Sequence, residues 1–101
     1  MKPYRFVSEA SAEFHDHIRY FDEQNPELGD RFIERVNAVI GDIRRYPESG
    51  VLMAGNVRKR VLRVFPYNVL YVNRPDEIII VAIAPHKRRP GYWRKRLWSL
   101  R

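Results

Sequence analysis

Seven consecutive apolar residues, Ile78–Ala84, form the longest hydrophobic run of the chain. The run is rich in β-branched residues and far shorter than the roughly 20 residues of a membrane-spanning helix, so it predicts a strand. A strand that is apolar at every position is covered on both faces. The chain has 101 residues and no cysteine, so no disulfide can compensate for a small core. We therefore expect this strand at the centre of a single domain, residues 1–101.

Three further segments have the composition of strands. Pro3–Val7 alternates apolar and polar residues, and Val57–Phe65 and Tyr67–Val72 are rich in β-branched and aromatic residues. Pro66 separates the last two and predicts a bend, since proline cannot donate to a β-ladder. A turn over residues 73–76 then leads into the apolar run. The three C-terminal strands are thus expected to form a meander.

Two helices are expected between the first strand and the meander. Ser8 is the predicted N-cap of the first helix, which ends near Gln24, and Asn25-Pro26 begins the second, which ends before Pro47. Each helix carries one apolar stripe at helical spacing: Ala10, Phe14, Ile18 and Phe21 in the first, and Leu28, Phe32, Val36, Val39, Ile40 and Ile43 in the second. The short connection predicts an antiparallel hairpin, followed by a loop over Glu48–Asn56.

These elements predict an α+β fold of two layers. The N-terminal strand and the C-terminal meander form a mainly antiparallel sheet, and the helical hairpin packs on one face of it. The other face of the central strand must also be covered. The returning C-terminal tail or a partner protein is the expected cover.

Charge is distributed unevenly along the chain. Residues 1–56 carry a net charge of −3, residues 57–85 carry +3, and the tail, residues 86–101, carries +7 without any acidic residue. Such a field attracts an anionic partner: nucleic acid, an acidic protein or a membrane surface. The tail lacks the amphipathic apolar face that membrane anchoring requires, and the N-terminus does not resemble a secretory signal. We expect an intracellular protein with no membrane contact.

The residues best suited to catalysis or ligand binding follow the apolar run. His86 has a side chain that can act as acid or base near neutral pH, Arg89 is a phosphate ligand, and Tyr92 can stack or relay a proton. Arg60 and Arg63, from a strand expected to pair nearby, could join them in cleaving RNA without a metal. Trp93 and Trp98 are expected to anchor the tail on the sheet or to stack on a partner. No cofactor or metal motif is present, and His15 and His17 do not share a helix face.

In element order and in several motifs, the chain resembles the RelE/ParE superfamily of toxins from bacterial type II toxin–antitoxin systems. The matching segments are residues 26–32, 46–47, 57–58, 65–71, 82–86 and 89–93. The resemblance implies a cytoplasmic toxin bound by an acidic, partly disordered antitoxin, with a heterotetramer as one expected assembly. RelE-like members cut mRNA on the ribosome, whereas ParE-like members bind and poison DNA gyrase.

Two absences favour the ParE-like branch. Residues Gly50–Val57 contain no lysine or arginine, and residues Val57–Val64 contain no carboxylate, although RelE-like nucleases keep catalytic groups there. The ending Pro90–Trp93 also favours ParE. Under this interpretation the helical hairpin and the basic half contact target or antitoxin through Arg58, Arg60, Arg89, Tyr92 and Trp93. The alternatives are a RelE-like ribosome-dependent nuclease that uses His86, Arg60, Arg63, Arg89 and Tyr92, and a basic interaction module without toxicity.

Overall fold

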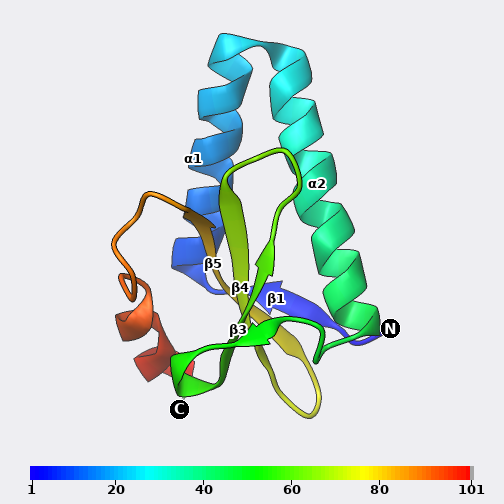
Figure 1. The fold of residues 1–101 in the computed structure, drawn as a ribbon, viewed down its shortest axis with the longest axis vertical. Helices are drawn as coiled ribbons and strands as arrows, with labels where there is room; N and C mark the ends of the chain where they lie inside the picture. Colours follow the sequence, from blue (N-terminus) through cyan, green and yellow to red (C-terminus); the bar gives the residue numbers. More distant parts are fainter. Residues whose placement is uncertain (101) are drawn as a thin grey trace.

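The computed structural model describes residues 1–100, so Arg101 of the basic tail lies outside the described residues. Strands β1 (Tyr4–Phe6), β2 (Val51–Leu52), β3 (Val57–Val61), β4 (Tyr67–Asn73) and β5 (Ile78–Pro85) form one sheet in the order β1-β5-β4-β3-β2. Strand β1 pairs parallel with β5, and the other three pairings are antiparallel. Helices α1 (Ser8–Gln24) and α2 (Pro26–Arg45) form an antiparallel hairpin (Figure 1). The predicted α+β fold is confirmed.

The apolar run forms the central strand β5, as its composition predicts. Every residue from Ile78 to Ala84 is buried. The hairpin covers one face of the sheet with a core built around Phe32, which is fully buried. Phe21, Phe65 and Tyr67 surround this ring, with centroids 5.0, 5.2 and 4.9 Å from it. The predicted stripes of both helices therefore meet the sheet through one aromatic cluster.

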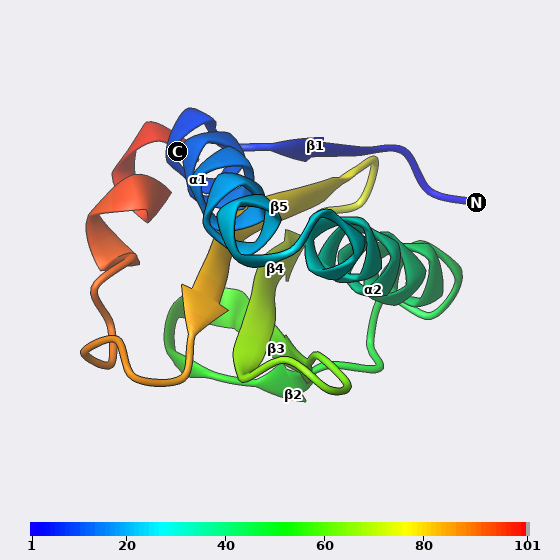
Figure 2. The ribbon, with the colours of Figure 1, turned by 90° about the horizontal axis from the view of Figure 1, so that it is seen from above.

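The tail of the chain covers the other face of the sheet. It ends in a 3₁₀ helix, Arg94–Leu100, and Figure 2 shows it across the sheet from α2, with β4 and β5 between them. Trp93 is buried there against Val57, Leu70 and Val81. Trp93 thus anchors the tail, as expected, whereas Trp98 is 66% exposed. Of the two expected covers for this face, the tail is the one observed.

Three local predictions are wrong. The N-cap of α1 is Val7, whose carbonyl accepts from the Ser11 amide at 3.0 Å, and the Ser8 hydroxyl caps nothing. Strand β3 ends at Val61, four residues before Phe65, and a strand through Phe65 is excluded by Val64, whose φ of +77° lies outside the strand region. The predicted loop 48–56 contains β2, which pairs with β3. The Asn25 cap is confirmed: its side chain accepts from the Glu27 amide at 3.0 Å.

No helix within residues 1–100 combines the length and the apolar character that crossing a bilayer demands.

Candidate functional site

A carboxylate on α1 fixes the tail. Glu13 accepts two hydrogen bonds from the Arg96 guanidinium, at 2.7 and 3.0 Å, and one from the Tyr92 hydroxyl at 2.6 Å. Both side chains of the Glu13–Arg96 pair are almost buried, at 14% and 13% exposure. Charge-assisted, forked pairing of this kind fixes orientation as well as position. We call Glu13, Tyr92 and Arg96 the tail latch.

The tail latch also completes the edge of the sheet. Strand β1 pairs with β5 only as far as Ile80, so the next backbone groups of β5 have no neighbouring strand on that side. The Ile83 amide donates to Glu13 at 3.2 Å, and the Val81 carbonyl accepts from Arg96 at 2.9 Å. Buried backbone groups need such partners, so the two side chains take the place of a longer β1.

Tyr92 is held from three sides. Its hydroxyl donates to Glu13, and the guanidinium carbons of Arg88 and Arg96 lie 4.1 and 5.1 Å from its ring centroid. Burial, reinforced by the hydrogen bond to Glu13 and by its negative charge, raises the pKa of Tyr92 well above the usual range of a phenol. The hydroxyl therefore keeps its proton and acts as a donor within the chain.

A cleft of about 180 Å³ lies beside the latch, between the segment that follows β5 and strands β3 and β4. We call it the basic cleft. Besides Tyr92 of the latch, its polar lining consists of Lys59, Asn68, His86, Arg88 and Arg89. His86 and Asn68 contact each other at 3.1 Å between Nε2 and Oδ1. Among the described lining residues there is no carboxylate.

The structure places the predicted site residues in three locations. His86, Arg89, Tyr92 and Trp93 line the basic cleft, whereas Arg58 and Arg60 do not. In the β3–β4 register Arg58 lies opposite Tyr71 and Arg60 opposite Val69, both in the core under the helices. These two arginines thus lie on the helix face of the sheet. Arg63 is exposed in the β3–β4 connection.

Arg58 and Arg60 are engaged within the chain. Arg58 donates to the carbonyls of Glu48 and Gly50 at 3.1 and 2.9 Å. Arg60 donates to the Ser49 hydroxyl at 2.9 Å and pairs with Asp42 of α2 at 3.4 Å. Both side chains therefore order the loop between α2 and β2.

Sequence reasoning missed Glu13. The available signal was its place beside the apolar stripe of α1, one turn after the buried Ala10 and next to Phe14. A carboxylate on the buried face of a helix needs a partner, and only the fold shows that this partner is Arg96. Alternation along β3 allowed either Arg58 and Arg60 or Lys59 and Arg63 to join His86, and Lys59 is the cation that β3 supplies to the basic cleft.

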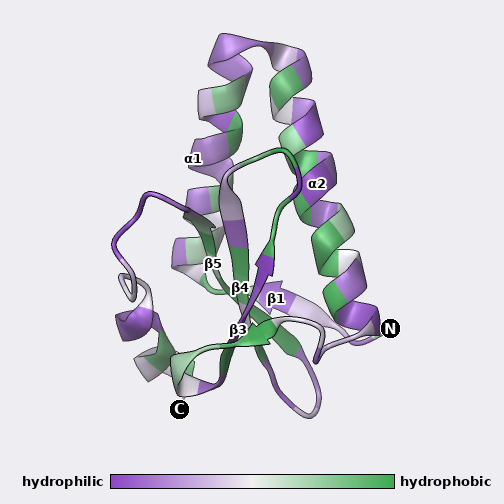
Figure 3. Cartoon of the chain, in the orientation of Figure 1, coloured by the Kyte–Doolittle hydropathy of each residue, from purple (hydrophilic) through white to green (hydrophobic). Residues whose placement is uncertain are grey.

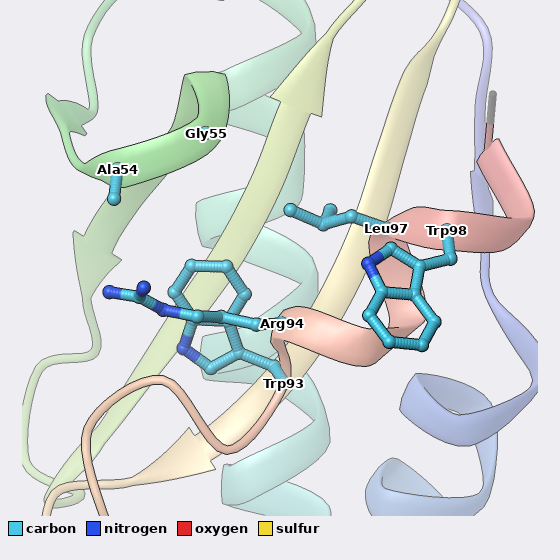
Figure 4. A pocket seen from close by; sticks show the side chains of 6 residues that line it. All are labelled: Ala54, Gly55, Trp93, Arg94, Leu97 and Trp98. Atoms are coloured by element: carbon cyan, nitrogen blue, oxygen red, sulfur yellow. The ribbon is translucent and has the colours of Figure 1, made fainter.

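A second hollow of about 190 Å³ lies between the tail and the turn at Ala54–Gly55. Figure 4 shows its lining side chains, with Leu97 reaching toward Gly55 from the 3₁₀ helix. Trp93 lines both this hollow and the basic cleft, so the two are neighbours on the tail side of the molecule. Within residues 1–100, His, Asp and Glu side chains form no group of three suited to a metal.

Comparison with known proteins agrees with this fold. A solved structure of the "Chromosomal ParDE TA system from P. aeruginosa" matches with a TM-score of 0.72 at 16% identity, covering 84% of this chain and 96% of that one. The sequence has no match among curated proteins. The family model of the ParE toxin of the type II toxin–antitoxin system parDE matches residues 4–90, which include the basic cleft's cations but not Trp93 or Arg96. The chain belongs to the ParE toxin family.

Proposed function

We propose that this chain is a cytoplasmic toxin that stops growth by binding and poisoning DNA gyrase, and that a cognate acidic antitoxin neutralises it. The observation that carries the proposal is the ParE family match over residues 4–90. The chain acts by binding and contributes no chemistry of its own.

The geometry of the basic cleft supports binding over RNA cleavage. A nuclease needs a base, an acid and a phosphate clamp around one phosphate. Arg60 lies on the opposite face of the sheet from His86, and the Tyr92 hydroxyl is held by Glu13. No carboxylate among the described lining residues is available as a base. The set proposed for a nuclease is therefore dispersed.

Within the proposed contact set, Arg89 is the best candidate for direct contact. It is exposed and lines the basic cleft. Tyr92 and Trp93 hold the segment that presents it, through the tail latch and the second core. Arg58 and Arg60 contribute to binding indirectly, because they order the loop between α2 and β2.

The charge distribution supports an acidic antitoxin. The tail, residues 86–101, holds seven basic residues and no acidic one, and Lys87, Arg88, Arg89, Arg94 and Lys95 are exposed. A partner that neutralises this surface must bring negative charge. The similar solved structure from P. aeruginosa is that of a ParDE system, which supports a toxin–antitoxin complex here, with a heterotetramer as the proposed assembly.

Expression of the chain without its antitoxin tests the target. Gyrase poisoning should give filamentous cells, accumulated cleaved DNA complexes, and inhibition of supercoiling by purified gyrase. Arg89→Ala should weaken that inhibition, while Arg5→Ala, at an exposed arginine of β1 outside the helical hairpin and the basic half, should leave it unchanged. Immediate arrest of translation, lost in a folded His86→Ala variant, would instead establish the nuclease. No growth defect would favour a module without toxicity.

A further inference from the structure

We infer that the basic cleft binds the phosphodiester backbone of a nucleic acid. The cleft gathers Lys59 from β3 with His86, Arg88 and Arg89 from the segment after β5. This is a convergence of four nitrogen-bearing side chains from two parts of the fold around one cavity of about 180 Å³. Cationic and imidazole donors of this kind are the usual ligands of phosphate oxygens.

The four nitrogen-bearing side chains of the cleft form no ion pair within the described part of the chain. No carboxylate lines it among residues 1–100. Glu13, which contacts the neighbouring segment, is committed to Arg96, Tyr92 and the Ile83 amide. An external anion can therefore pair with these cations without displacing a carboxylate of the chain, which favours anion binding there.

Arg88 and His86, two of the four donors, are held in place before any ligand binds. The Arg88 guanidinium carbon lies 4.1 Å from the Tyr92 ring centroid, and Tyr92 is in turn fixed by Glu13. A guanidinium that packs on a ring by its face keeps in-plane N–H groups for a phosphate. The backbone amide of His86 donates to the Pro66 carbonyl at 2.8 Å, and its ring contacts Asn68. Such order lowers the entropy cost of binding.

The cationic surface extends beyond the cleft, which favours a polymer over a small anion. Lys87, Arg94 and Lys95 are exposed on the same segment. Figure 3 shows the loop after β5 as a strongly hydrophilic stretch at the end of the apolar strand. A nucleic-acid strand presents one phosphate about every 3.4 Å, so it can meet the cleft and these flanking cations together.

The test is direct binding, with no gyrase present, so its result is independent of the proposed target. The full chain is titrated against a labelled 30-base-pair DNA duplex and a single-stranded RNA of the same length, from 50 to 300 mM KCl. Poly-L-glutamate of equal total charge serves as the carboxylate probe. We expect binding of at least one nucleic acid with an affinity that falls steeply with salt, and weaker binding of poly-L-glutamate. Whichever of the DNA duplex and the RNA binds with the higher affinity is the nucleic acid whose phosphates the cleft contacts.

The variant Lys59→Gln/Arg89→Gln keeps the aliphatic stems and removes two cations of the cleft. It should lose about tenfold or more in affinity at 100 mM KCl and reduce the salt slope by about 1 to 2. Arg31→Gln/Arg45→Gln, which removes two exposed arginines of α2, should lose less than about threefold although its net charge falls equally.

Three results would overturn the inference. The first is equal loss in the two variants, because net charge alone would then explain binding. The second is no binding of either nucleic acid at 50 mM KCl. The third is preferential binding of poly-L-glutamate, which would make the cleft a site for acidic protein segments. Thermal unfolding of both variants, followed by circular dichroism, verifies that each is folded during the titration.

Discussion

Glu13 on α1 and Arg96 on the tail form a forked ion pair, with N–O distances of 2.7 and 3.0 Å, although 83 positions separate them in the chain. The pair joins the first helix to the 3₁₀ helix Arg94–Leu100, beside the C-terminal half of β5. The same two side chains satisfy the Ile83 amide and the Val81 carbonyl. One contact between distant parts of the sequence therefore helps to hold the tail over this face of the sheet, together with the buried Trp93.

Glu13→Ala should lower the free energy of unfolding by about 3 kcal/mol, because it leaves the Arg96 guanidinium buried without its partner. Urea unfolding measures this change, and a double-mutant cycle with Arg96→Met isolates the coupling between the two residues. Asp16→Ala is the control, since Asp16 and Arg19 form an exposed pair at 3.8 Å that should contribute less than about 1 kcal/mol. Similar losses for Glu13→Ala and Asp16→Ala would contradict the tail latch.

Replacing Gly50 and Gly41 by alanine should change the free energy of unfolding in opposite directions. A Cβ on Gly50 would lie 2.7 Å from the Tyr71 hydroxyl, which also accepts from the Gly50 amide at 2.9 Å. Gly50→Ala should therefore lower the free energy of unfolding by about 2 kcal/mol through overpacking and a weakened hydrogen bond. A Cβ on Gly41, inside α2, meets nothing within 4 Å.

Gly41→Ala should thus raise the free energy of unfolding by about 0.5 to 1 kcal/mol, since alanine is the better helix former. Chemical denaturation of both variants under one set of conditions checks the pair. A Gly50→Ala protein as stable as the parent would show that the loop after α2 can move away from Tyr71.

Local patterns predicted most of the fold. The Ile78–Ala84 run identified the central strand, and Asn25-Pro26 identified the start of α2 with its cap. The hairpin followed from two apolar stripes and a short connection. Each of these signals lies within one element, so the sequence alone contains it.

The features that position the site depend on contacts between distant segments. The sequence could not show that Glu13 meets Arg96, or that Arg58 and Arg60 face α2 while Lys59 faces the tail. Alternation along a strand separates the two faces but does not say which helix or tail covers each one. The left-handed backbone at Val64, after the end of β3, could not be predicted either, because valine is an unusual residue at a positive φ.

Val64 carries a backbone strain that a substitution should relieve. Its φ is +77°, its side chain is 74% exposed, and a β-branched residue is disfavoured in this left-handed region. Val64→Asn should raise the free energy of unfolding by about 1 kcal/mol, because asparagine tolerates this conformation far better. Thermal and urea unfolding provide the measurement.

Val61→Asn provides the matched comparison for Val64→Asn. Val61 is also exposed, at 53%, but it is paired with Asn68 in the β3–β4 ladder. There asparagine should be destabilising by up to about 1 kcal/mol, since it fits a strand poorly. If both substitutions change the free energy of unfolding in the same direction, the positive φ of Val64 does not destabilise the protein.

His17 should make stability depend on pH. The Tyr67 hydroxyl lies 3.0 Å from its Nδ1, and the ring packs on Tyr67 with centroids 4.8 Å apart. Burial lowers the pKa of His17 below its usual value; Glu13 and Asp16 oppose this shift, and the positive charges of Arg88 and Lys87 add to it. The folded protein therefore holds this imidazole neutral at pH values where the unfolded chain already binds a proton.

The sign of the pH effect follows from proton binding. Below about pH 6.5 the unfolded state takes up a proton at His17 that the folded state does not, so stability falls as pH decreases from there through the folded pKa. Urea unfolding of His17→Gln and His15→Gln between pH 5 and 7.5 measures this contribution. His15 is exposed, so its variant should keep the parental slope while His17→Gln loses part of it. Identical slopes in the two variants would mean that the contact between α1 and Tyr67 tolerates a charged imidazole.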